Sequence, residues 1–158
     1  MDLTIRASSH KDVDAILELW KEFTQDPNSI DRPIPLHTEN TRRWREFIDE
    51  LLDEDPRQIQ VAEENGKLVG YVISQKIVKT LDKLDMAYGW SYVYDLYVKQ
   101  THRRQGIGRE LLKATIEYLK SVGSEHVRLD VWHGNEGAIK LYRELGFREY
   151  IHILQIDL

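Results

Sequence analysis

Two kinds of hydrophobic periodicity organise the first part of the chain. Between residues 3 and 7 apolar and polar residues alternate, which is the pattern of a strand with one buried face. Apolar residues then recur at intervals of three and four positions within residues 16–23 and 38–52, and this spacing predicts two amphipathic helices. The segment between them, residues 26–35, contains three prolines and therefore predicts a loop.

A turn signal lies between the next two apolar segments. Residues 59–61 and 68–78 are rich in aliphatic side chains, and they flank the stretch Glu64-Asn65-Gly66-Lys67. Asn and Gly both tolerate the positive φ angles that a two-residue type I′ turn requires, so this stretch predicts a β-hairpin. Aromatic and β-branched residues then fill residues 90–98, which predicts a central strand.

The second half of the chain predicts alternating strands and helices. A strong amphipathic pattern begins at Ile107 and ends before Gly123, which occupies the position of a left-handed helix cap. The remaining expected elements are a strand at residues 127–131, a short helix at 138–145 and an extended segment at 150–158. The resulting order, β-α-α-β-β-β-α-β-α-β, describes a single mixed α/β domain over residues 1–158 with a β-α-β crossover.

Composition excludes several classes of protein. The chain has 158 residues, a size typical of one domain, and its 41% hydrophobic and 31% charged residues fit a globular fold rather than a disordered or collagen-like one. It contains no apolar run near the roughly 20 residues of a membrane helix, and its first residues lack the features of a secretory signal. Without cysteine it has neither disulfides nor thiolate sites, so we expect a cytoplasmic protein with no membrane attachment.

The distribution of charge points to a local anion site. The formal net charge of −5 disfavours general binding to nucleic acid. Residues 99–113, here called the basic segment, nevertheless contain five cations and one acid, a net charge of +4. The cations of the basic segment are Lys99, Arg103, Arg104, Arg109 and Lys113.

The glycine turn within the basic segment has the chemistry of a phosphate site. It lies between a predicted strand and a predicted helix, whose first amide groups lack intrahelical partners and favour anions. Glycine at positions 106 and 108 would let a phosphate approach the backbone. A dinucleotide fingerprint would need a further glycine where the chain has Leu111, and a P-loop would need Gly-Lys-Ser or Gly-Lys-Thr. On these residues alone, a tight turn surrounded by solvated arginines is an equal alternative.

Two spaced motifs resemble those of a known family. The sequence Asp95-Leu96-Tyr97-Val98, followed by Arg-x-x-Gly-x-Gly at residues 103–108, resembles motif A of the GNAT superfamily of N-acetyltransferases. Residues 135–147, with the pattern Asn-x-x-Ala-x-x-x-Tyr-x-x-x-Gly-Phe, resemble its motif B at the usual distance downstream. The resemblance implies a GNAT-like α/β fold, with a mixed, mostly antiparallel central sheet that contains a splayed parallel strand pair and is flanked by helices.

The resemblance also implies where acetyl-CoA would bind as a co-substrate. Backbone groups of the central strand would bond the pantetheine arm, amides of the glycine turn would hold the pyrophosphate, and the last helix would line the other side. The residues implied are Leu96, Tyr97, Val98, Arg103, Arg104, Gln105, Gly106, Ile107, Gly108, Arg109 and Asn135. No metal is implied, and the six histidines show no tight ligand spacing.

The mechanism implied by the resemblance is direct attack of a neutral amine on the thioester in a ternary complex. A backbone N–H near Leu96 would stabilise the oxyanion, and Tyr142 would protonate the departing thiolate. Tyrosine suits this role because its ordinary pKa of about 10 keeps it protonated at neutral pH. By spacing alone Tyr142 also fits a core aromatic, since it shares the apolar face of its helix with Ala138 and Leu145.

The sequence leaves the general base open. In polyamine-type relatives a Glu often precedes Asp-Leu/Phe-x-Val on this strand, and here that position is Tyr94. Asp95 follows it, but strand alternation points the two side chains to opposite faces, so Asp95 need not face the same cleft. The alternatives are a water relay through Tyr94, Tyr92 or backbone carbonyls, and a carboxylate from the first two helices.

The identity of the acceptor is open as well. The motifs describe the donor only, so polyamines, amino acids, antibiotics, protein N-termini and lysine side chains all fit. The aromatic residues Tyr88, Trp90, Tyr92 and Tyr94 could form a cation-binding pocket or simply pack in the sheet. We expect transfer of acetyl to a primary amine of a small molecule or peptide by a homodimer, as is common among relatives, with no nucleic acid partner. The alternative is a non-catalytic CoA-binding or sensing domain.

Overall fold

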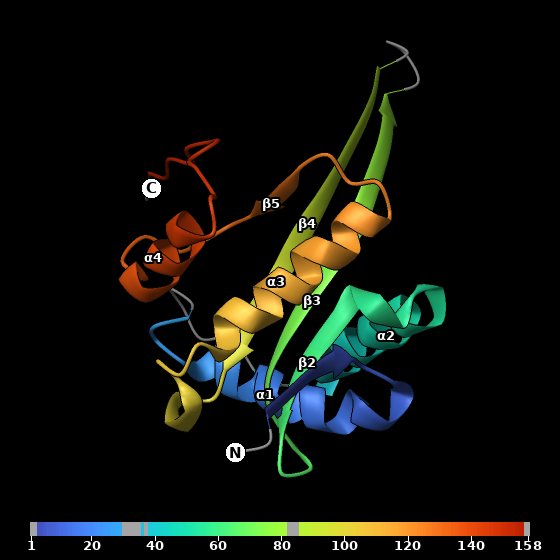
Figure 1. Ribbon diagram of the computed structural model, residues 1–158, viewed down its shortest axis with the longest axis vertical. Helices are drawn as coiled ribbons and strands as arrows, with labels where there is room; N and C mark the ends of the chain where they lie inside the picture. Colours follow the sequence, from blue (N-terminus) through green and yellow to red (C-terminus); the bar gives the residue numbers. More distant parts are fainter. Residues whose placement is uncertain (1–2, 30–35, 37, 82–85, 157–158) are drawn as a thin grey trace.

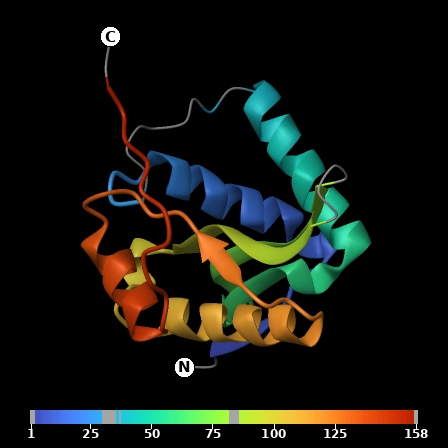
Figure 2. The same cartoon turned by 90° about the horizontal axis from the view of Figure 1, so that it is seen from above.

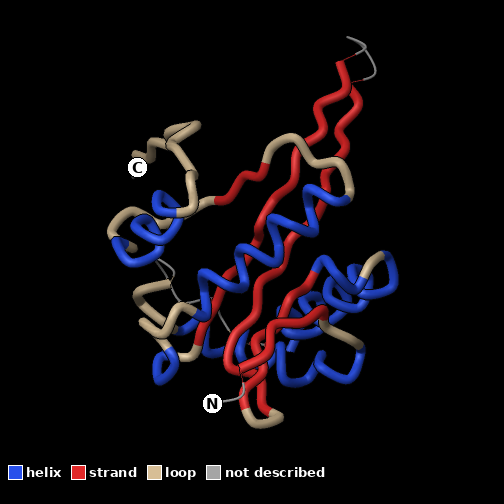
Figure 3. The backbone as a smooth tube through the Cα atoms, viewed as in Figure 1, coloured by secondary structure: helices blue, strands red, loops and turns tan. Residues whose placement is uncertain are grey.

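A single sheet organises the computed structural model, which describes residues 3–29, 36, 38–81 and 86–156. Within these residues five strands follow the order β1-β2-β3-β4-β5, so each strand lies beside the next one in sequence (Figures 1 and 3). The strands are β1 (Leu3–Ala7), β2 (Ile59–Glu64), β3 (Lys67–Leu81), β4 (Met86–Val98) and β5 (Val127–Leu129). The helices are α1 (Val13–Gln25), α2 (Thr38–Glu54), α3 (Ile107–Ser121) and α4 (Glu136–Glu144), with 3-10 turns η1 (His10–Asp12), η2 (Pro56–Gln58) and η3 (Gln100–His102).

The strand pairing confirms the expected mixed, mostly antiparallel sheet. Strands β1 to β4 pair antiparallel, and β4 pairs with β5 in parallel through the crossover helix α3. At the β2–β3 turn Asn65 and Gly66 have φ angles of 51° and 75°, both positive as a type I′ turn requires. Gly123 ends α3 with a φ of 78°, as the sequence predicted for a left-handed cap.

Helices cover both faces of the sheet and produce three layers (Figure 2). On one face α1 and α2 pack in a core around Ile16, Ile48 and Tyr71, which are fully buried. On the other face α3 contributes Leu111 and Leu112 to a second core. Since burial of one large apolar side chain contributes roughly 1.5 to 3 kcal/mol, these two cores hold the helices to the sheet.

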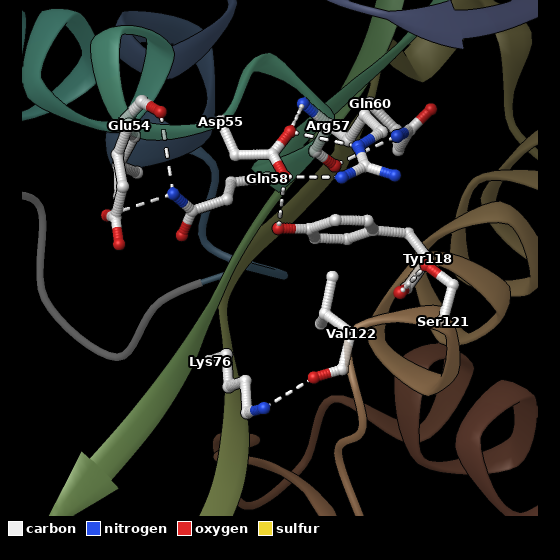
Figure 4. A network of polar contacts seen from close by, with 10 residues as sticks. Glu54, Asp55, Arg57, Gln58, Gln60, Lys76, Tyr118, Ser121 and Val122 are labelled. Carbon is white, nitrogen blue, oxygen red and sulfur yellow. Dashed lines mark hydrogen bonds and ion pairs between the residues drawn. The ribbon is translucent and has the colours of Figure 1, made fainter.

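A polar network fixes the end of α2 against α3 (Figure 4). The Asp55 carboxylate accepts hydrogen bonds from Nη2 of Arg57 at 2.8 Å and from the hydroxyl of Tyr118 at 3.3 Å. The Arg57 side chain keeps the pKa of Asp55 below its usual range and lies 5.1 Å from the centre of the Tyr118 ring. Lys76 on β3 also donates to the carbonyl of Val122, just after α3. These contacts hold the sheet, the end of α2 and α3 in fixed positions relative to one another.

The last expected strand is wrong. Residues 148–156 form no strand, and the large apolar side chains at 150–156 are exposed. The neighbouring strand β5 ends at Leu129, two residues earlier than expected, and so offers an edge of only three residues to pair with. Arg128 of β5 keeps the start of the segment nearby, because its guanidinium lies 4.4 Å from the ring centre of Tyr150. Residues 157–158, and residues 30–35 of the expected loop, lie outside the described residues.

Candidate functional site

The parallel pair β4–β5 separates in the middle of the sheet. Pairing ends at Val93 and Leu129. From there β4 continues to Val98 with no partner strand on that side in the described part of the chain, while β5 leads away to α4 (Figure 1). The N–H of Lys99 donates to the carbonyl of Val69 on β3, so antiparallel alternation turns the backbone groups of Leu96 and Val98 toward the open side. The backbone of Tyr97 bonds β3 by the same alternation.

The turn from β4 to α3 presents unbonded amide groups. Arg104 and Gly106 have φ angles of 64° and 84°, and Gly106 is the residue before the first turn of α3. Within the described residues the amide groups of residues 104–108 donate no hydrogen bond. A Cβ at Gly106 would meet no atom within 4 Å, so the backbone there is open to a ligand. Together with the positive end of the helix dipole, this geometry suits a phosphate group.

Most cations of the basic segment are already paired with carboxylates. The pairs are Lys99 with Glu22, Arg103 with Asp26, Arg109 with Glu144, and Lys113 with Glu110. Arg104 is exposed and has no carboxylate partner among the described residues. The charge excess seen in the sequence is therefore largely neutralised, and Arg104 is the cation left to reach an anion.

Arg103 has a structural role in addition to its place in the motif. Its guanidinium bonds the carboxylate of Asp26, a side chain that is only 1% exposed, and its Nε donates to the carbonyl of Val98 at 3.1 Å. Burial acts to raise the pKa of Asp26, but the bonds from Arg103 and from the N–H of Asn28 outweigh it and lower that pKa. This pair could not be predicted from the sequence, because its partners lie 77 positions apart.

Arg103→Ala should lower the free energy of unfolding by about 2 to 4 kcal/mol, because the buried Asp26 carboxylate would lose its guanidinium. Urea denaturation at pH 7 measures this loss. Since the folded-state pKa of Asp26 is lowered, its stabilising contribution is present above the unfolded pKa of about 4 and is lost as the pH falls through the folded pKa. The deficit of the variant should therefore shrink in acid. Arg104→Ala, the control, should change stability by less than about 0.5 kcal/mol, and equal losses in both variants would contradict the assignment.

Helix α4 brings Asn135 and Tyr142 to the same region. Asn135 caps the helix by accepting a hydrogen bond from the N–H of Ala138 at 3.2 Å. Contact between α3 and α4 is close, since a Cβ at Gly108 would lie 3.4 Å from Cδ2 of Leu141. Arg109 on α3 also pairs with Glu144 on α4, which fixes the two helices relative to each other.

Tyr142 combines a packed ring with an unpaired hydroxyl. Its ring centre lies 5.8 Å from that of Phe147, and the ring packs against the core formed with α3. Within the described residues no side-chain hydrogen bond acts on its hydroxyl. Burial, and then the charge of Asp95, raise the pKa of Tyr142 to about 12. Tyr142 is therefore protonated at neutral pH, and its hydroxyl is not engaged in a hydrogen bond with another described residue.

A β-bulge changes which side chains of β4 share a face. Ile73 on β3 pairs with Asp95, whereas the next residue, Ser74, pairs with Val93, so Tyr94 is an extra residue in β4. The Tyr94 ring lies 5.4 Å from that of Phe47 on α2, and Asp95 faces the same α1–α2 side. The expectation that Tyr94 and Asp95 point to opposite faces is wrong, because a bulge breaks strand alternation.

Aromatic rings line the α1–α2 side of β4. The centres of Tyr92 and Tyr94 are 5.3 Å apart, and those of Trp90 and Tyr92 are 5.9 Å apart. Tyr94 is 38% exposed and donates to Oε1 of Gln75 at 3.0 Å. The side chain of Tyr88 lies outside the described part of the structure.

The described residues contain neither a metal-binding cluster nor a membrane-spanning helix. Nowhere among them do three or more His, Asp or Glu side chains lie together so that they could hold a metal ion. None of the described helices is long and apolar enough to cross a bilayer.

Comparison with known proteins agrees with this geometry. The sequence profile of the acetyltransferase (GNAT) family matches residues 14–147. An uncharacterized N-acetyltransferase of Methanocaldococcus jannaschii is 31% identical over 148 residues, which cover 92% of this chain and 61% of that protein. An N-alpha-acetyltransferase of Sulfurisphaera tokodaii is 36% identical over 106 residues, which cover 65% of this chain and 64% of that protein. The matched part of this chain thus spans about three fifths of the length of each relative.

The fold is also shared with a solved structure. The aminoglycoside acetyltransferase AAC(6′)-Iy, in complex with a bisubstrate analogue of CoA and acetylneamine, superposes with a TM-score of 0.76. The alignment covers 100% of this chain and 99% of that one at 16% sequence identity. At this identity the likeness concerns the fold alone.

Proposed function

The chain belongs to the acetyltransferase (GNAT) family, and we propose that it transfers the acetyl group of acetyl-CoA to a primary amine. The observation that carries the proposal is the row of unbonded amides at residues 104–108, next to the edge of β4 that β5 leaves open. The pyrophosphate of acetyl-CoA fits the amides and Arg104, and its pantetheine arm fits the backbone groups of Leu96 and Val98. Arg103, Gln105, Ile107, Gly108, Arg109 and Asn135 shape this surface.

In the proposed mechanism each group of the chain has one task. The Leu96 N–H, which points to the open side of β4, donates to the carbonyl oxygen of the acetyl group as negative charge develops there. The Tyr142 hydroxyl, which is protonated at neutral pH, gives its proton to the departing sulfur. The amine attacks in its neutral form and needs a proton acceptor.

A non-catalytic CoA-binding or sensing domain is the second candidate function. Such a domain needs the amides of the glycine turn but has no use for a free hydroxyl beside the donor. The unpaired hydroxyl of Tyr142 therefore favours the enzyme.

The test is turnover of acetyl-CoA, followed by thiol release, with a panel of polyamines, amino acids, aminoglycosides and N-terminal peptides. Calorimetry of acetyl-CoA binding accompanies it. Turnover with one class of amine would support the proposal and identify the acceptor. Tight binding with no turnover would favour the sensing domain, and no binding would contradict both.

We also propose a homodimer held by the exposed C-terminal segment, residues 150–156. The side chains of Ile151, Ile153, Leu154 and Ile156 are 71% to 92% exposed, and so many exposed apolar side chains in one short segment favour a contact site. A second copy is the proposed partner, because the isoleucine-rich segment favours an extended backbone and finds no long enough strand edge among the described residues. We further propose that residues 1–158 form a single domain and that the protein is located in the cytoplasm.

Sedimentation across a range of concentrations should find a dimer that Ile153→Asp dissociates. Leu36→Asp, a matched change at an apolar position that is 42% exposed elsewhere, should leave the dimer intact. A monomer at every concentration would refute the homodimer.

A further inference from the structure

We propose that Asp95 is the catalytic base that accepts the proton of the attacking amine, an assignment that rests on the proposed acetyl transfer. Asp95 lies on β4 next to Leu96, whose N–H faces the open side of the strand pair. The residue as a whole is half-buried, and in the proposed complex a substrate nitrogen reaches its carboxylate directly or through one water.

The bulge at Tyr94 places this carboxylate on the acceptor side of the strand. Without the extra residue Asp95 and Tyr94 would face opposite ways, but both lie on the α1–α2 side, Tyr94 against Phe47 and Asp95 against Tyr71. The aromatic surface of β4 and the carboxylate are therefore neighbours. A cationic amine that stacks on these rings would bring its nitrogen toward Asp95.

Asp95 differs from the other shielded carboxylates of the chain. Asp12 and Asp26 are bound by Arg6 and Arg103, and their pKa values are lowered. Such pairs hold a permanent negative charge and have a structural role. Asp95 has no cation partner in the described residues, and its one side-chain hydrogen bond there comes from a neutral hydroxyl. Without a cation to hold its negative charge, the Asp95 carboxylate can be protonated and deprotonated during a reaction, unlike the carboxylates of Asp12 and Asp26.

The neighbours of Asp95 are tyrosines, and one more carboxylate is bonded to one of these tyrosines. Tyr71 on β3 donates to Oδ2 of Asp95 at 3.2 Å, Tyr97 lies beside Tyr71, and Tyr142 of α4 is close enough for its pKa to respond to Asp95. Glu22 of α1 accepts from the Tyr97 hydroxyl at 3.3 Å. Burial raises the pKa of Asp95 to about 7, and the bond from Tyr71 opposes that rise. The carboxylate is thus poised near neutral pH, where a general base works best.

The proton count of the reaction closes with Asp95 and Tyr142 together. The neutral amine forms the new C–N bond, the C–S bond breaks, and the sulfur takes the proton of the Tyr142 hydroxyl. The nitrogen, positively charged after attack, releases one proton to the Asp95 carboxylate. Transfer of that proton from Asp95 to the tyrosinate, directly or through water, restores both groups, so the products are the amide and the free thiol.

The decisive experiment is the pH dependence of kcat/KM for the full chain with an amine found in the acceptor panel. The wild type should show an acidic limb with its inflection near pH 7, because Asp95 must be unprotonated. Asp95→Asn should reduce kcat/KM at pH 7.5 by about 10²- to 10⁴-fold and abolish that limb. Acetyl-CoA affinity by calorimetry should be unchanged, since the side chain is not part of the phosphate site.

Tyr71→Phe is a second variant, which retains the Asp95 carboxylate and removes only the hydrogen bond that it accepts from Tyr71. Loss of the donated hydrogen bond removes a stabiliser of the carboxylate, so the acidic limb should shift to higher pH while the plateau at high pH is retained. A merely structural role of the pair would lower activity at all pH values instead. The matched control is Asp55→Asn, since Asp55 also accepts from a tyrosine hydroxyl, and its pH profile should equal that of the wild type.

The outcomes separate this proposal from the proposed function. An Asp95→Asn variant with the wild-type acidic limb overturns the role of Asp95 and leaves acetyl transfer standing. An unmoved limb in Tyr71→Phe does the same. A wild-type protein that binds acetyl-CoA but acetylates no amine overturns the proposed function, and the role of Asp95 falls with it.

Discussion

Glutamate in place of Gly106 should weaken acetyl-CoA binding by about a thousandfold or more while the protein still folds. The Cβ at this position would project into space with no atom within 4 Å, so the new side chain fits without a clash. Its carboxylate would stand in front of the amides of residues 104–108, where the pyrophosphate is proposed to bind. Two like charges about 4 Å apart near a protein surface repel by about 4 kcal/mol, and each 1.4 kcal/mol is about tenfold in affinity.

The control for this change is Gly66→Glu, in the turn between β2 and β3. Gly66 also has a positive φ, 75° against 84° for Gly106, and its Cβ would likewise meet nothing within 4 Å. Both variants therefore carry the same added charge and the same left-handed strain of about 1 to 2 kcal/mol. Calorimetry should show wild-type affinity for acetyl-CoA in Gly66→Glu only. Equal affinities in both variants would remove the glycine turn from the binding site.

The elements with strong local patterns were predictable from the sequence. Helices α1, α2 and α3 each carry an apolar stripe that matches the helical period, and the stripe fixed their place and their buried face. The Asn65-Gly66 turn was predictable for the same reason, since only residues that accept positive φ angles suit it. The glycine turn before α3 combines both kinds of local signal.

Features that depend on distant contacts were not predictable. The bulge at Tyr94 arises from the register between β3 and β4, and a single inserted residue leaves no mark on the sequence of one strand. The neutralised basic segment is a second case, because Asp26 and Glu144, which pair with Arg103 and Arg109, lie far from it in sequence. The net charge of +4 counted along residues 99–113 therefore overstated the positive charge available to an anion there.

The C-terminal segment shows the limit of local strand propensity. Its isoleucines favour an extended segment, yet a strand forms only where another backbone edge is available. The three residues of β5 are too few to supply that edge within the described residues. Local propensity predicts an extended backbone, and the tertiary fold decides whether the strand exists.

Removal of one hydroxyl, in Tyr142→Phe, should slow acetyl transfer by about 10² to 10⁴ while acetyl-CoA binding is largely kept. The ring would still pack against Phe147 and the α3 core, so the fold of α4 should be preserved. What the variant loses is the proton for the departing sulfur, and without it the thiolate must leave as an anion in partly buried surroundings. Thiol release under saturating acetyl-CoA measures the effect on kcat.

The hydroxyl of Tyr118 supplies the matched control, because burial likewise raises its pKa to about 12 and it belongs to the network with Asp55 at the end of α2. Tyr118→Phe removes a hydrogen bond and should reduce stability by about 1 kcal/mol while kcat stays at the wild-type value. A large loss of kcat in Tyr142→Phe alone would assign the proton donor. Wild-type turnover in Tyr142→Phe would exclude Tyr142 from the chemistry and restore the interpretation of a packing aromatic.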